Sequence, residues 1–586
     1  MNYNLNDISA TQQKTSTLRA LQKLLQLITE ERKALLLALV AILVNSGLNL
    51  LAPFIMGYVI DTYVLHKNYH GVLVWAGILL AMYMVAFVAS YLQTRMMGGV
   101  GQRMLFKLRN TIFTKLQDLP VEFFNQNKAG DLISRVNNDT DKINQFFSQS
   151  LMQFIGTIAT MTGAGIFLLV INFRLGVATL LPGLVIFIFT KFSSPWIKKR
   201  NATSLQCTGG LSAEIQESLH NFKVIIAFNR RDYFRNRFEE ANNKNYTTAI
   251  GAGIANNVLI PVYGFFAGIA QLIVLTFGIH LISTGHFSIG LLVSYLAYAV
   301  NFYNPLRQLA ALWANFQVAM AGWDRISYII RMETSLPVIQ ATSVENNSFI
   351  MEFRNVSFGY NEGKEILHNV NFAFEPGKTY ALVGPTGGGK TTTASIIARL
   401  YDPLKGQVFL DKRDIRTYQP AERTDKIGFI LQDPFLFTGT VRENILYGNK
   451  QYNNFSNEQL EETIRTSGLQ SLLYIFEQGL DTEVSTGGES ISLGQKQLIA
   501  FMRAVLRNPV LLVLDEATAN IDTITEQILQ DILNRLPSTT TRVIIAHRLN
   551  TIQNADEIFF VNAGEVIRAG SFDHAVDMLL NDERES

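Results

Sequence analysis

The sequence has little charge, a single cysteine and no excess of either sign of charge. Of its 586 residues, 17% are charged and 48% are hydrophobic, whereas soluble domains carry about 25% charged residues. Cys207 is the only cysteine, which excludes an internal disulfide and a cysteine-based metal site. The 50 Lys and Arg nearly balance the 48 Asp and Glu, and this balance predicts no nucleic-acid partner. The shortage of charge indicates a membrane protein.

Charge is missing from five long stretches in the first 330 residues. No Asp, Glu, Lys or Arg occurs in residues 34–60, 71–94, 143–173, 175–190 and 245–306. A membrane-spanning helix needs about 20 mainly apolar residues. The first four stretches therefore predict one span each, and the last, which is broken at Ser-Thr-Gly, predicts two. The uncharged stretches therefore predict six membrane spans in total. They are longer than the helices in the core of a soluble protein need to be.

Basic residues are concentrated in two of the connections. Residues 95–142 contain eight Lys and Arg and residues 191–244 contain ten, whereas the other three connections hold only Lys67 and Arg174. Connections rich in Lys and Arg stay on the cytoplasmic side. We therefore expect both termini and the two long connections to be cytoplasmic, in a multi-pass protein of an inner or plasma membrane.

Outside the spans, composition predicts several further elements. Residues 1–15 are polar, and we expect them to be unordered. Residues 16–33 carry an apolar stripe of helical period with basic flanks, which predicts a helix lying in the membrane interface or, alternatively, an extension of the first span. In the long connections we expect helices over 103–115 and 228–242. The glycine and asparagine residues of 130–139 predict a helix break there.

The last 240 residues are typical of a soluble α/β domain with a phosphate-binding loop. They contain the pattern G-x-x-x-x-G-K-[ST], preceded by a short apolar run that predicts a strand and followed by a predicted helix over 390–400. Glycines let backbone N–H groups surround a phosphate, a lysine neutralises its charge, and a threonine hydroxyl reaches Mg²⁺. The predicted nucleotide-binding residues are Gly384, Pro385, Thr386, Gly387, Gly388, Gly389, Lys390, Thr391 and Thr392.

Two further apolar runs, 510–514 and 543–546, predict parallel strands that are buried on both faces. Asp515 follows the first run, where a carboxylate can hold Mg²⁺. Glu516 is placed to act as a general base on the attacking water. His547 follows the second run and is predicted to contact the γ-phosphate, although a lone histidine is more often structural.

A third motif, Ile-Ser-Leu-Gly-Gln-Lys-Gln at residues 491–497, lies upstream of Asp515. Together these motifs resemble, in type and order, those of an ATP-binding cassette exporter half-transporter, in which six spans precede a nucleotide-binding domain. The resemblance covers nearly the whole chain. It implies that Tyr360 stacks on adenine, that Gln432 senses Mg²⁺ and water, and that Asp522 faces the partner domain.

The resemblance implies a fold, a cofactor set and a mechanism. The fold is an all-α membrane domain of six helices followed by an α/β P-loop domain. Two such chains would enclose two ATP molecules, with Mg²⁺ at Thr391, Gln432 and Asp515. Ser492, Gly494 and Gln495 would bind the ATP held by the partner chain. The cytoplasmic turns near 137–141 and 210–217 would be the coupling helices, which dock on the ATP-binding domains and couple them to alternating access of the membrane domain.

The expected domain bounds are 1–33 for the N-terminal segment and interfacial helix, 34–330 for the membrane domain, 331–347 for a linker and 348–586 for the nucleotide-binding domain. Two positions depart from the family pattern. Gly388 replaces a frequent serine, with a mild effect expected, and Thr486 replaces a frequent glutamate. The second departure, together with the sequence Ala-Asn-Ile-Asp at residues 519–522, resembles members that pair two different chains, so both a homodimer and a heterodimer remain open.

The cargo is less well specified than the nucleotide. Polar residues in the predicted spans tend to face a cavity or another helix, and the charge we expect to face the cavity is Arg307. We expect an apolar or amphipathic drug, lipid or peptide, with contact to membrane lipid. An ATP-gated channel or regulator is the alternative, and the fused domain order argues against an importer. The polar candidates are Asn45, Asn49, Tyr295, Tyr298, Asn301 and Gln308.

Overall fold

The structure is a computed structural model that describes residues 3–5, 31–333, 336–340, 348–360, 364–485, 490–515, 523–545 and 553–585. The chain divides into two compact units. The helical unit contains residues 12–116 and 130–331. The α/β unit contains residues 1–11, 117–129 and 332–586.

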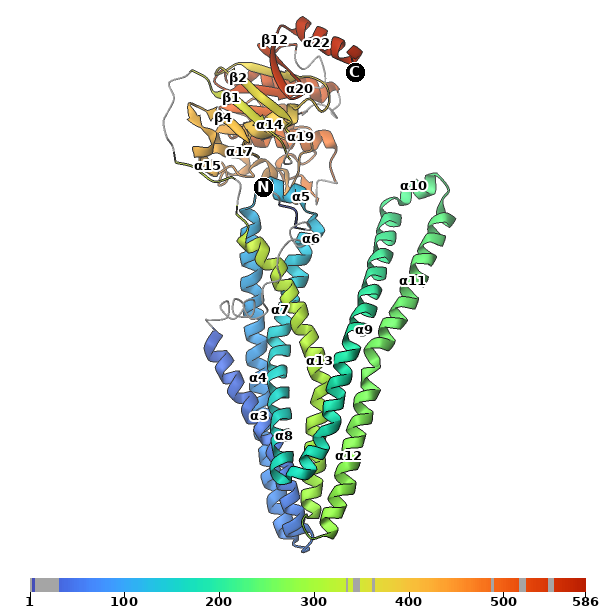
Figure 1. The fold of residues 1–586 in the computed structure, drawn as a ribbon. Coiled ribbons are helices and arrows are strands. Elements are labelled where there is room, and N and C mark those ends of the chain that lie inside the picture. Colours follow the sequence, from blue (N-terminus) through green and yellow to red (C-terminus); the bar gives the residue numbers. More distant parts are fainter. Residues whose placement is uncertain are drawn as a thin grey trace. The chain divides into compact units, whose positions relative to one another are not determined.

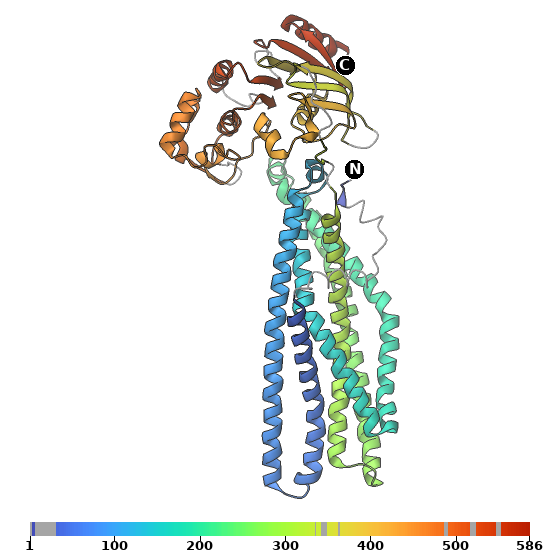
Figure 2. The same cartoon turned by 90° about the vertical axis from the view of Figure 1, so that its left-hand side faces the viewer.

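The helical unit consists of long helices joined by short turns (Figure 1). Helix α9 packs along α11 and α12, and α13 packs against α3 and α8, as two views show (Figure 1, Figure 2). The helices are α3 (Arg32–Val59) with the π-turn η2 (Ile60–Val64), α4 (Tyr69–Gln117), α6 (Ala129–Ser134), η3 (Arg135–Asp139), α7 (Thr140–Gln145), η4 (Phe146–Ser150), α8 (Leu151–Ile171), α9 (Phe173–His220), α10 (Phe222–Ala227), α11 (Arg231–Asn257), α12 (Leu259–Ser283) and α13 (Ile289–Arg331).

Among the described residues, 5 helical segments are long and apolar enough to cross a membrane. They contain the first five predicted spans. The sixth predicted span is the first part of α13, a helix of 43 residues in which Tyr, Asn and Ser interrupt the apolar sequence. The helical membrane domain is thus confirmed, and the sixth crossing stays a prediction. The five segments are Arg32–Val64, Tyr69–Gln117, Ala129–Ile171, Phe173–His220 and Arg231–Ser283.

The first long connection turns earlier than predicted. The chain leaves α4 at Gln117, forms the short helix α5 (Val121–Gln126) and enters the next helical run at Ala129. Pro120, in an extended conformation, precedes α5, and proline without an N–H suits a helix start. Residues 130–141, where we predicted a helix break and a coupling turn, lie inside continuous helical structure. That prediction is wrong.

The second long connection turns later than predicted. Helix α9 continues to His220, so residues 210–217 lie inside it and do not form the predicted coupling turn. The turn consists of α10 and of Asn229, whose φ is +48°, a conformation that asparagine tolerates better than most residues. Helix α11 then begins at Arg231, inside the helix predicted over 228–242. The chain stays helical through Gly130, Gly209 and Gly210, because a glycine costs a helix only about 1 kcal/mol relative to alanine.

Helices α3 and α13 meet through small residues near one end of the helical unit. A Cβ atom added to Gly290 would overlap the main-chain oxygen of Gly57 and the carboxylate of Asp61. Asp61 accepts hydrogen bonds from the Ser288 hydroxyl and from the Gly290 N–H, the latter at 2.8 Å. The Ser294 hydroxyl donates to the Pro53 carbonyl at 2.7 Å. Glycine lets the two backbones approach, as is common between membrane helices.

The α/β unit contains a six-stranded sheet in the order β12-β11-β3-β10-β9-β6. β3 is parallel to β10 and β11, β9 is parallel to β6 and β10, and β12 is antiparallel to β11. All five residues of β9 are buried, which explains the apolar run 511–514 that precedes Asp515. The strands are β3 (Thr379–Val383), β6 (Ile427–Ile430), β9 (Leu511–Asp515), β10 (Thr541–Ile545), β11 (Glu557–Asn562) and β12 (Glu565–Gly570).

A second, antiparallel sheet has the order β2-β1-β4-β5, and a hydrophobic core joins it to the first sheet and to α14. A separate hydrophobic core contains residues from the helices α16 through α20 and from the strands β9 and β10. The elements are β1 (Met351–Phe358), β2 (Leu367–Phe374), β4 (Lys405–Leu410), β5 (Arg413–Asp414), β7 (Gly439–Thr440), β8 (Glu483–Val484), α14 (Lys390–Ile397), η5 (Ile415–Thr417), α15 (Pro420–Lys426), α16 (Val441–Ile445), α17 (Asn457–Thr466), α18 (Gln470–Leu473), η6 (Gly479–Asp481), α19 (Leu493–Val505), α20 (Thr523–Arg535) and α22 (Phe572–Glu585).

Part of the segment that we expected to be unordered is packed. Tyr3 and Leu5 are 1% and 2% exposed and belong to the α/β unit. For residues 3–5 the prediction is therefore wrong. The reason is that this part of the polar stretch contains one aromatic and one aliphatic side chain, and both are buried against residues that are distant in the sequence. The interfacial helix predicted within 16–33 lies almost wholly outside the described residues.

Candidate nucleotide site

The glycine-rich loop joins strand β3 to helix α14, as predicted. Gly384, Gly387 and Gly389 have φ angles of +146°, +89° and +116°, which other residues rarely adopt. A Cβ atom on Gly388 would overlap the main-chain oxygen of Val561 on the neighbouring strand β11. The loop therefore turns tightly against the sheet. Its lack of side chains lets the main chain approach a phosphate closely.

Lys390 is the first residue of α14 and is 5% exposed. Its ammonium donates hydrogen bonds to the main-chain oxygens of Gly384, at 2.7 Å, and Pro385, at 3.0 Å. The positive charge thus lies within the loop and beside the start of α14. The free N–H groups and the dipole of a helix start favour an anion, so the loop, the lysine and the helix together suit a polyphosphate.

Thr391 and Asp515 are brought together from distant parts of the chain. The Thr391 hydroxyl donates to Asp515 Oδ1 at 3.5 Å. Asp515 is the last residue of β9 and is 3% exposed. Hydroxyl and carboxylate oxygens are ligands that Mg²⁺ takes, alongside phosphate oxygens and water. The pair therefore fits the predicted cation beside a phosphate-binding loop.

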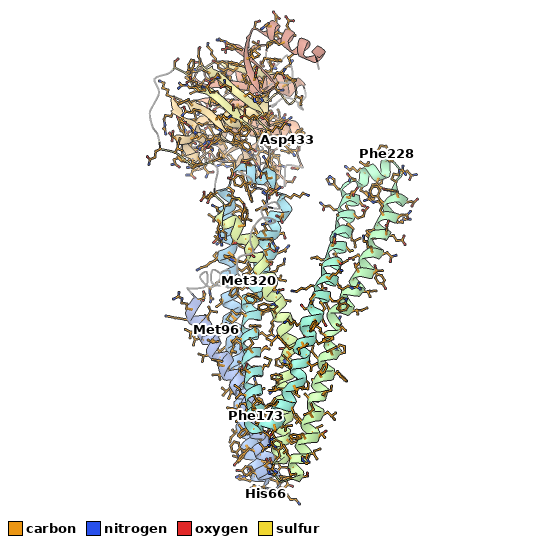
Figure 3. The ribbon with its side chains drawn as sticks, viewed as in Figure 1. His66, Met96, Phe173, Phe228, Met320 and Asp433 are labelled. Carbon is orange, nitrogen blue, oxygen red and sulfur yellow. The ribbon has the colours of Figure 1, made fainter. Side chains whose placement is uncertain are left out.

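The ends of three parallel strands meet at this edge of the sheet. Asp515 is in register with Ile545, the last residue of β10, and β6 ends beside β9. Gln432 follows β6 by two residues and is exposed, and Figure 3 labels its neighbour Asp433. The other three residues predicted after the strands, Glu516, Asp522 and His547, lie outside the described residues.

Tyr360 lies beside the start of α14. Its hydroxyl is 3.3 Å from the Thr392 hydroxyl, and its half-buried ring packs edge-on against Phe358 and Tyr401, with centroid separations of 5.1 Å for each pair. These neighbours fix the ring next to the phosphate-binding helix. This position suits an aromatic side chain that stacks on a base.

The signature residues form the start of α19. Ser492 caps this helix: its hydroxyl accepts from the Gln495 N–H at 3.2 Å, while the Gln495 side chain accepts from the Ser492 N–H at 2.8 Å. Ser492 is exposed, and Gly494 and Gln495 are half-buried. The Gln495 side chain also donates to the Ile475 carbonyl at 3.5 Å. The structure thus leaves a second helix start exposed.

Sequence reasoning missed Tyr401 and Asn125. The Asn125 side chain, on α5, donates a hydrogen bond of 2.7 Å to the Tyr401 hydroxyl. Burial raises the pKa of this hydroxyl, and the bond from Asn125 opposes that shift in part. Because Tyr401 also touches Tyr360, α5 is connected to the predicted adenine-binding ring. An isolated asparagine on a short helix and an isolated tyrosine after α14 carry no sequence pattern that would have identified them.

Two of the candidate cargo-facing residues instead join helices. Tyr295 and Tyr298 are fully buried, and their hydroxyls donate to the main-chain oxygens of Leu168 on α8 and Leu50 on α3, at 2.7 Å each. These bonds match the helix-joining role that we kept as the alternative. Asn49 donates to Asn45 one turn away at 3.1 Å. Asn301 is half-buried and Gln308 exposed, and the Arg307 side chain lies outside the described part.

Comparison with known proteins identifies the family. The family model of the ABC transporter transmembrane region matches residues 35–306, and that of the ABC transporter matches residues 367–519. The ABC transporter ATP-binding protein YfiC of Bacillus subtilis is 34% identical over 95% of this chain and 92% of its own length. The fatty acid ABC transporter ATP-binding/permease protein of Mycobacterium tuberculosis is 31% identical, over 84% and 77%. The ATP-dependent lipid A-core flippase of Syntrophus aciditrophicus is 30% identical, over 94% and 91%.

The chain therefore belongs to the ABC transporter family. It carries the transmembrane region and the ATP-binding domain in one polypeptide, as a half-transporter does. It is a multi-pass membrane protein that binds ATP and couples ATP hydrolysis to export.

Proposed function

We propose that the protein exports an apolar or amphipathic substrate (a drug, lipid or peptide) by alternating access. The observation that carries the proposal is the phosphate-binding loop with Lys390 and the Thr391–Asp515 pair, in one chain with long apolar helices. The absence of Asp and Glu from the predicted spans supports such a cargo over a small cation. Two relatives named for a fatty acid and for lipid A-core support an amphipathic lipid.

In this proposal, residues 384–392 hold the phosphates and Tyr360 packs on the adenine. Thr391, Gln432 and Asp515 would hold Mg²⁺, which neutralises phosphate charge when bound. Glu516 takes a proton from the attacking water, and His547 contacts the γ-phosphate. The buried, hydrogen-bonded Asp515 supports this assignment for the metal side of the site.

We also propose that the site is completed by a second chain. Ser492, Gly494 and Gln495 stand at an exposed helix start, which suits an anion supplied by a partner. The partner is either an identical chain or a different half-transporter, and Thr486, which lies outside the described residues, bears on that choice. The assembled dimer would lie in the inner or plasma membrane, with both termini cytoplasmic. The proposed domain bounds are 1–33, 34–330, 331–347 and 348–586.

Helix α10 is our revised candidate for one coupling helix. It lies at the tip of the α9–α11 hairpin, where Figure 3 labels Phe228. Phe222, Val224 and Phe228 are all exposed there, Phe228 to 75%. Exposed apolar patches of this kind mark protein contacts. We propose that α10 docks on the ATP-binding domain of the partner chain.

The variant Glu516→Gln tests the catalytic assignment. It keeps the shape of the side chain but cannot accept a proton, and loss of a positioned base typically costs about 10²–10⁴-fold in rate. We expect steady-state ATP hydrolysis to fall by that factor, while Mg²⁺–ATP binding persists because Lys390, Thr391 and Asp515 are unchanged. Nucleotide retention is measured on the purified assembly. Near-normal turnover, or loss of ATP retention, would assign Glu516 another role.

Reconstituted vesicles separate the export proposal from the channel or regulator alternative. A pump moves its cargo against a gradient when ATP is present, whereas a channel passes it only down the gradient. A panel of lipids, peptides and drugs is first screened for stimulation of ATP hydrolysis, and the best compound is then used for transport. Uphill movement supports export, and ATP-dependent downhill flux alone would support a gated channel.

A further inference from the structure

The Tyr3–Leu5 segment lies in a site formed by α5 and by the residues that follow α13. Although it is surrounded by polar sequence, Tyr3 is among the most fully buried large side chains of the described residues. The segment, residues 117–129 and the residues after Arg331 all belong to the α/β unit. A tripeptide more than 100 positions away in sequence is therefore bound at residues 117–129 of the same unit.

The site binds the main chain of this segment. The side-chain amide of Asn127 accepts a hydrogen bond from the Leu5 N–H at 3.0 Å and donates one to the Tyr3 carbonyl at 2.9 Å. The Gln126 side chain accepts from the Tyr3 N–H at 2.7 Å. Two neighbouring amide side chains thus satisfy three main-chain groups, as a strand would in peptide recognition by strand addition.

The site also recognises the tyrosine side chain. Its ring packs edge-on against Phe123, which is fully buried on α5, with centroids 6.4 Å apart and an interplanar angle of 88°. Its hydroxyl donates to the main-chain oxygen of Glu333 at 3.2 Å. A buried aromatic ring with a hydrogen-bonded hydroxyl is a typical anchor residue. Tyr3 therefore links α5 to the residues that follow α13.

Both sides of this link also contact one turn of the α/β unit. From α5, Asn125 donates to the Tyr401 hydroxyl at 2.7 Å. From the residues after α13, the Pro337 carbonyl accepts from Arg399 at 2.9 Å. Arg399 and Tyr401 follow the phosphate-binding helix α14, and the ring of Tyr401 contacts Tyr360. The Tyr3–Leu5 segment thus closes a set of contacts that ends at the nucleotide site.

We propose that residues 120–127 and 332–333 form a peptide-binding site whose ligand is the chain's own Tyr3–Leu5 segment. Binding of this segment holds α5 in place against Tyr401. The segment is thereby a positioning element for the connection between α5 and the nucleotide site. Its effect on transport rests on the proposed function, whereas the binding itself does not.

Hydrogen–deuterium exchange of the full-length assembly tests the positioning role. Amide exchange of residues 121–127 is compared between the wild type, Tyr3→Ala, Tyr3→Phe and the control Tyr69→Ala, which changes an exposed tyrosine. Because an anchor side chain carries much of a binding free energy, we expect exchange about tenfold faster in Tyr3→Ala. Tyr3→Phe keeps the ring contact, so its exchange rate should lie between those of the wild type and Tyr3→Ala. The exchange rate of Tyr69→Ala should match that of the wild type. Equal exchange in Tyr3→Ala and the wild type would overturn the proposal.

A peptide experiment tests the site without any reference to transport. A chain lacking residues 2–8 is titrated with a fluorescently labelled peptide of residues 1–8, and anisotropy is measured. We expect saturable binding, weakened about tenfold when the peptide carries Tyr3→Ala or the chain carries Asn127→Ala. Absence of saturable binding, or identical binding of the Tyr3→Ala peptide, would overturn the proposal.

The functional consequence is measured separately. With the best cargo from the screen, Tyr3→Ala should keep basal ATP hydrolysis and lose most of its stimulation by cargo, and adding the wild-type peptide to the truncated chain should restore stimulation. If peptide binding is demonstrated but Tyr3→Ala retains the stimulation of ATP hydrolysis by cargo, the segment has no positioning role. Loss of all transport in the wild type would instead count against the proposed function.

Discussion

Tyr401 makes two different contacts through two parts of its side chain. Its hydroxyl accepts a hydrogen bond from Asn125, and its ring packs against Tyr360. Tyr401→Phe removes the first contact and keeps the second, whereas Tyr401→Ala removes both. We expect Tyr401→Phe to keep the ATP affinity of the wild type and Tyr401→Ala to lower it several-fold. Equilibrium titration with a fluorescent ATP analogue measures both.

A double-mutant cycle isolates the hydrogen bond. Asn125→Ala, Tyr401→Phe and their combination are compared by the free energy of opening of α5, from hydrogen exchange. A hydrogen bond of this kind contributes about 1 kcal/mol, so the coupling free energy should be near that value. Additive effects of the two changes would show that the bond does not stabilise α5.

At this scale the sequence identifies only residues with a local pattern. Gly384, Lys390 and Thr391 belong to one short motif, and in the structure Lys390 contacts Gly384 and Thr391 contacts Asp515. Asn125 bonds to Tyr401, and Tyr3 bonds to Glu333. In both pairs the partner is hundreds of positions away in the sequence. Such contacts depend on how the whole chain packs, and one sequence without relatives contains no signal for them.

Helices α3 and α13 cross so closely that there is little room for an added side chain between them. Gly290→Ala would place a methyl group against Gly57 and Asp61, and overpacking of this kind costs about 1–3 kcal/mol. Gly264→Ala on α12 is the matched control, because nothing lies within 4 Å of that position. We expect a lower thermal unfolding temperature in detergent for Gly290→Ala only. Equal unfolding temperatures would mean that the helices separate there without cost.

Element prediction succeeded where burial leaves a clear pattern. Strand β9 is predictable because both of its faces are covered, so its sequence is apolar up to the final Asp515. The long helices are predictable because lipid requires apolar length. The turns at α5 and α10 differ from the predicted ones, because residues 130–141 and 210–217 lie inside helical structure. A long helix accommodates glycine at a cost of only about 1 kcal/mol relative to alanine, while Pro120 and Asn229 mark the observed turns.

At the scale of the whole molecule, the arrangement of the site predicts a dimer. The glycine loop and the exposed start of α19 are both suited to phosphate, yet they belong to different elements. If each serves a different ATP, the active particle contains two ATP-binding domains. Mass measurement in nanodiscs should give two half-transporters per particle. An active monomer would contradict this arrangement.

Where the chain pairs with itself, complementation between two inactive variants tests the arrangement fully. Lys390→Ala removes the ammonium from the loop, and Gly494→Asp adds a carboxylate at the start of α19, so neither variant alone has an intact site. In a mixed dimer, both changes fall in one site and leave the other intact, provided that the signature serves the partner's ATP. The two chains carry different affinity tags and are purified through both. We expect the mixed dimer to retain ATP and to recover up to about half of the wild-type hydrolysis rate. A mixed dimer that neither retains nor hydrolyses ATP would place loop and signature of one chain around the same nucleotide.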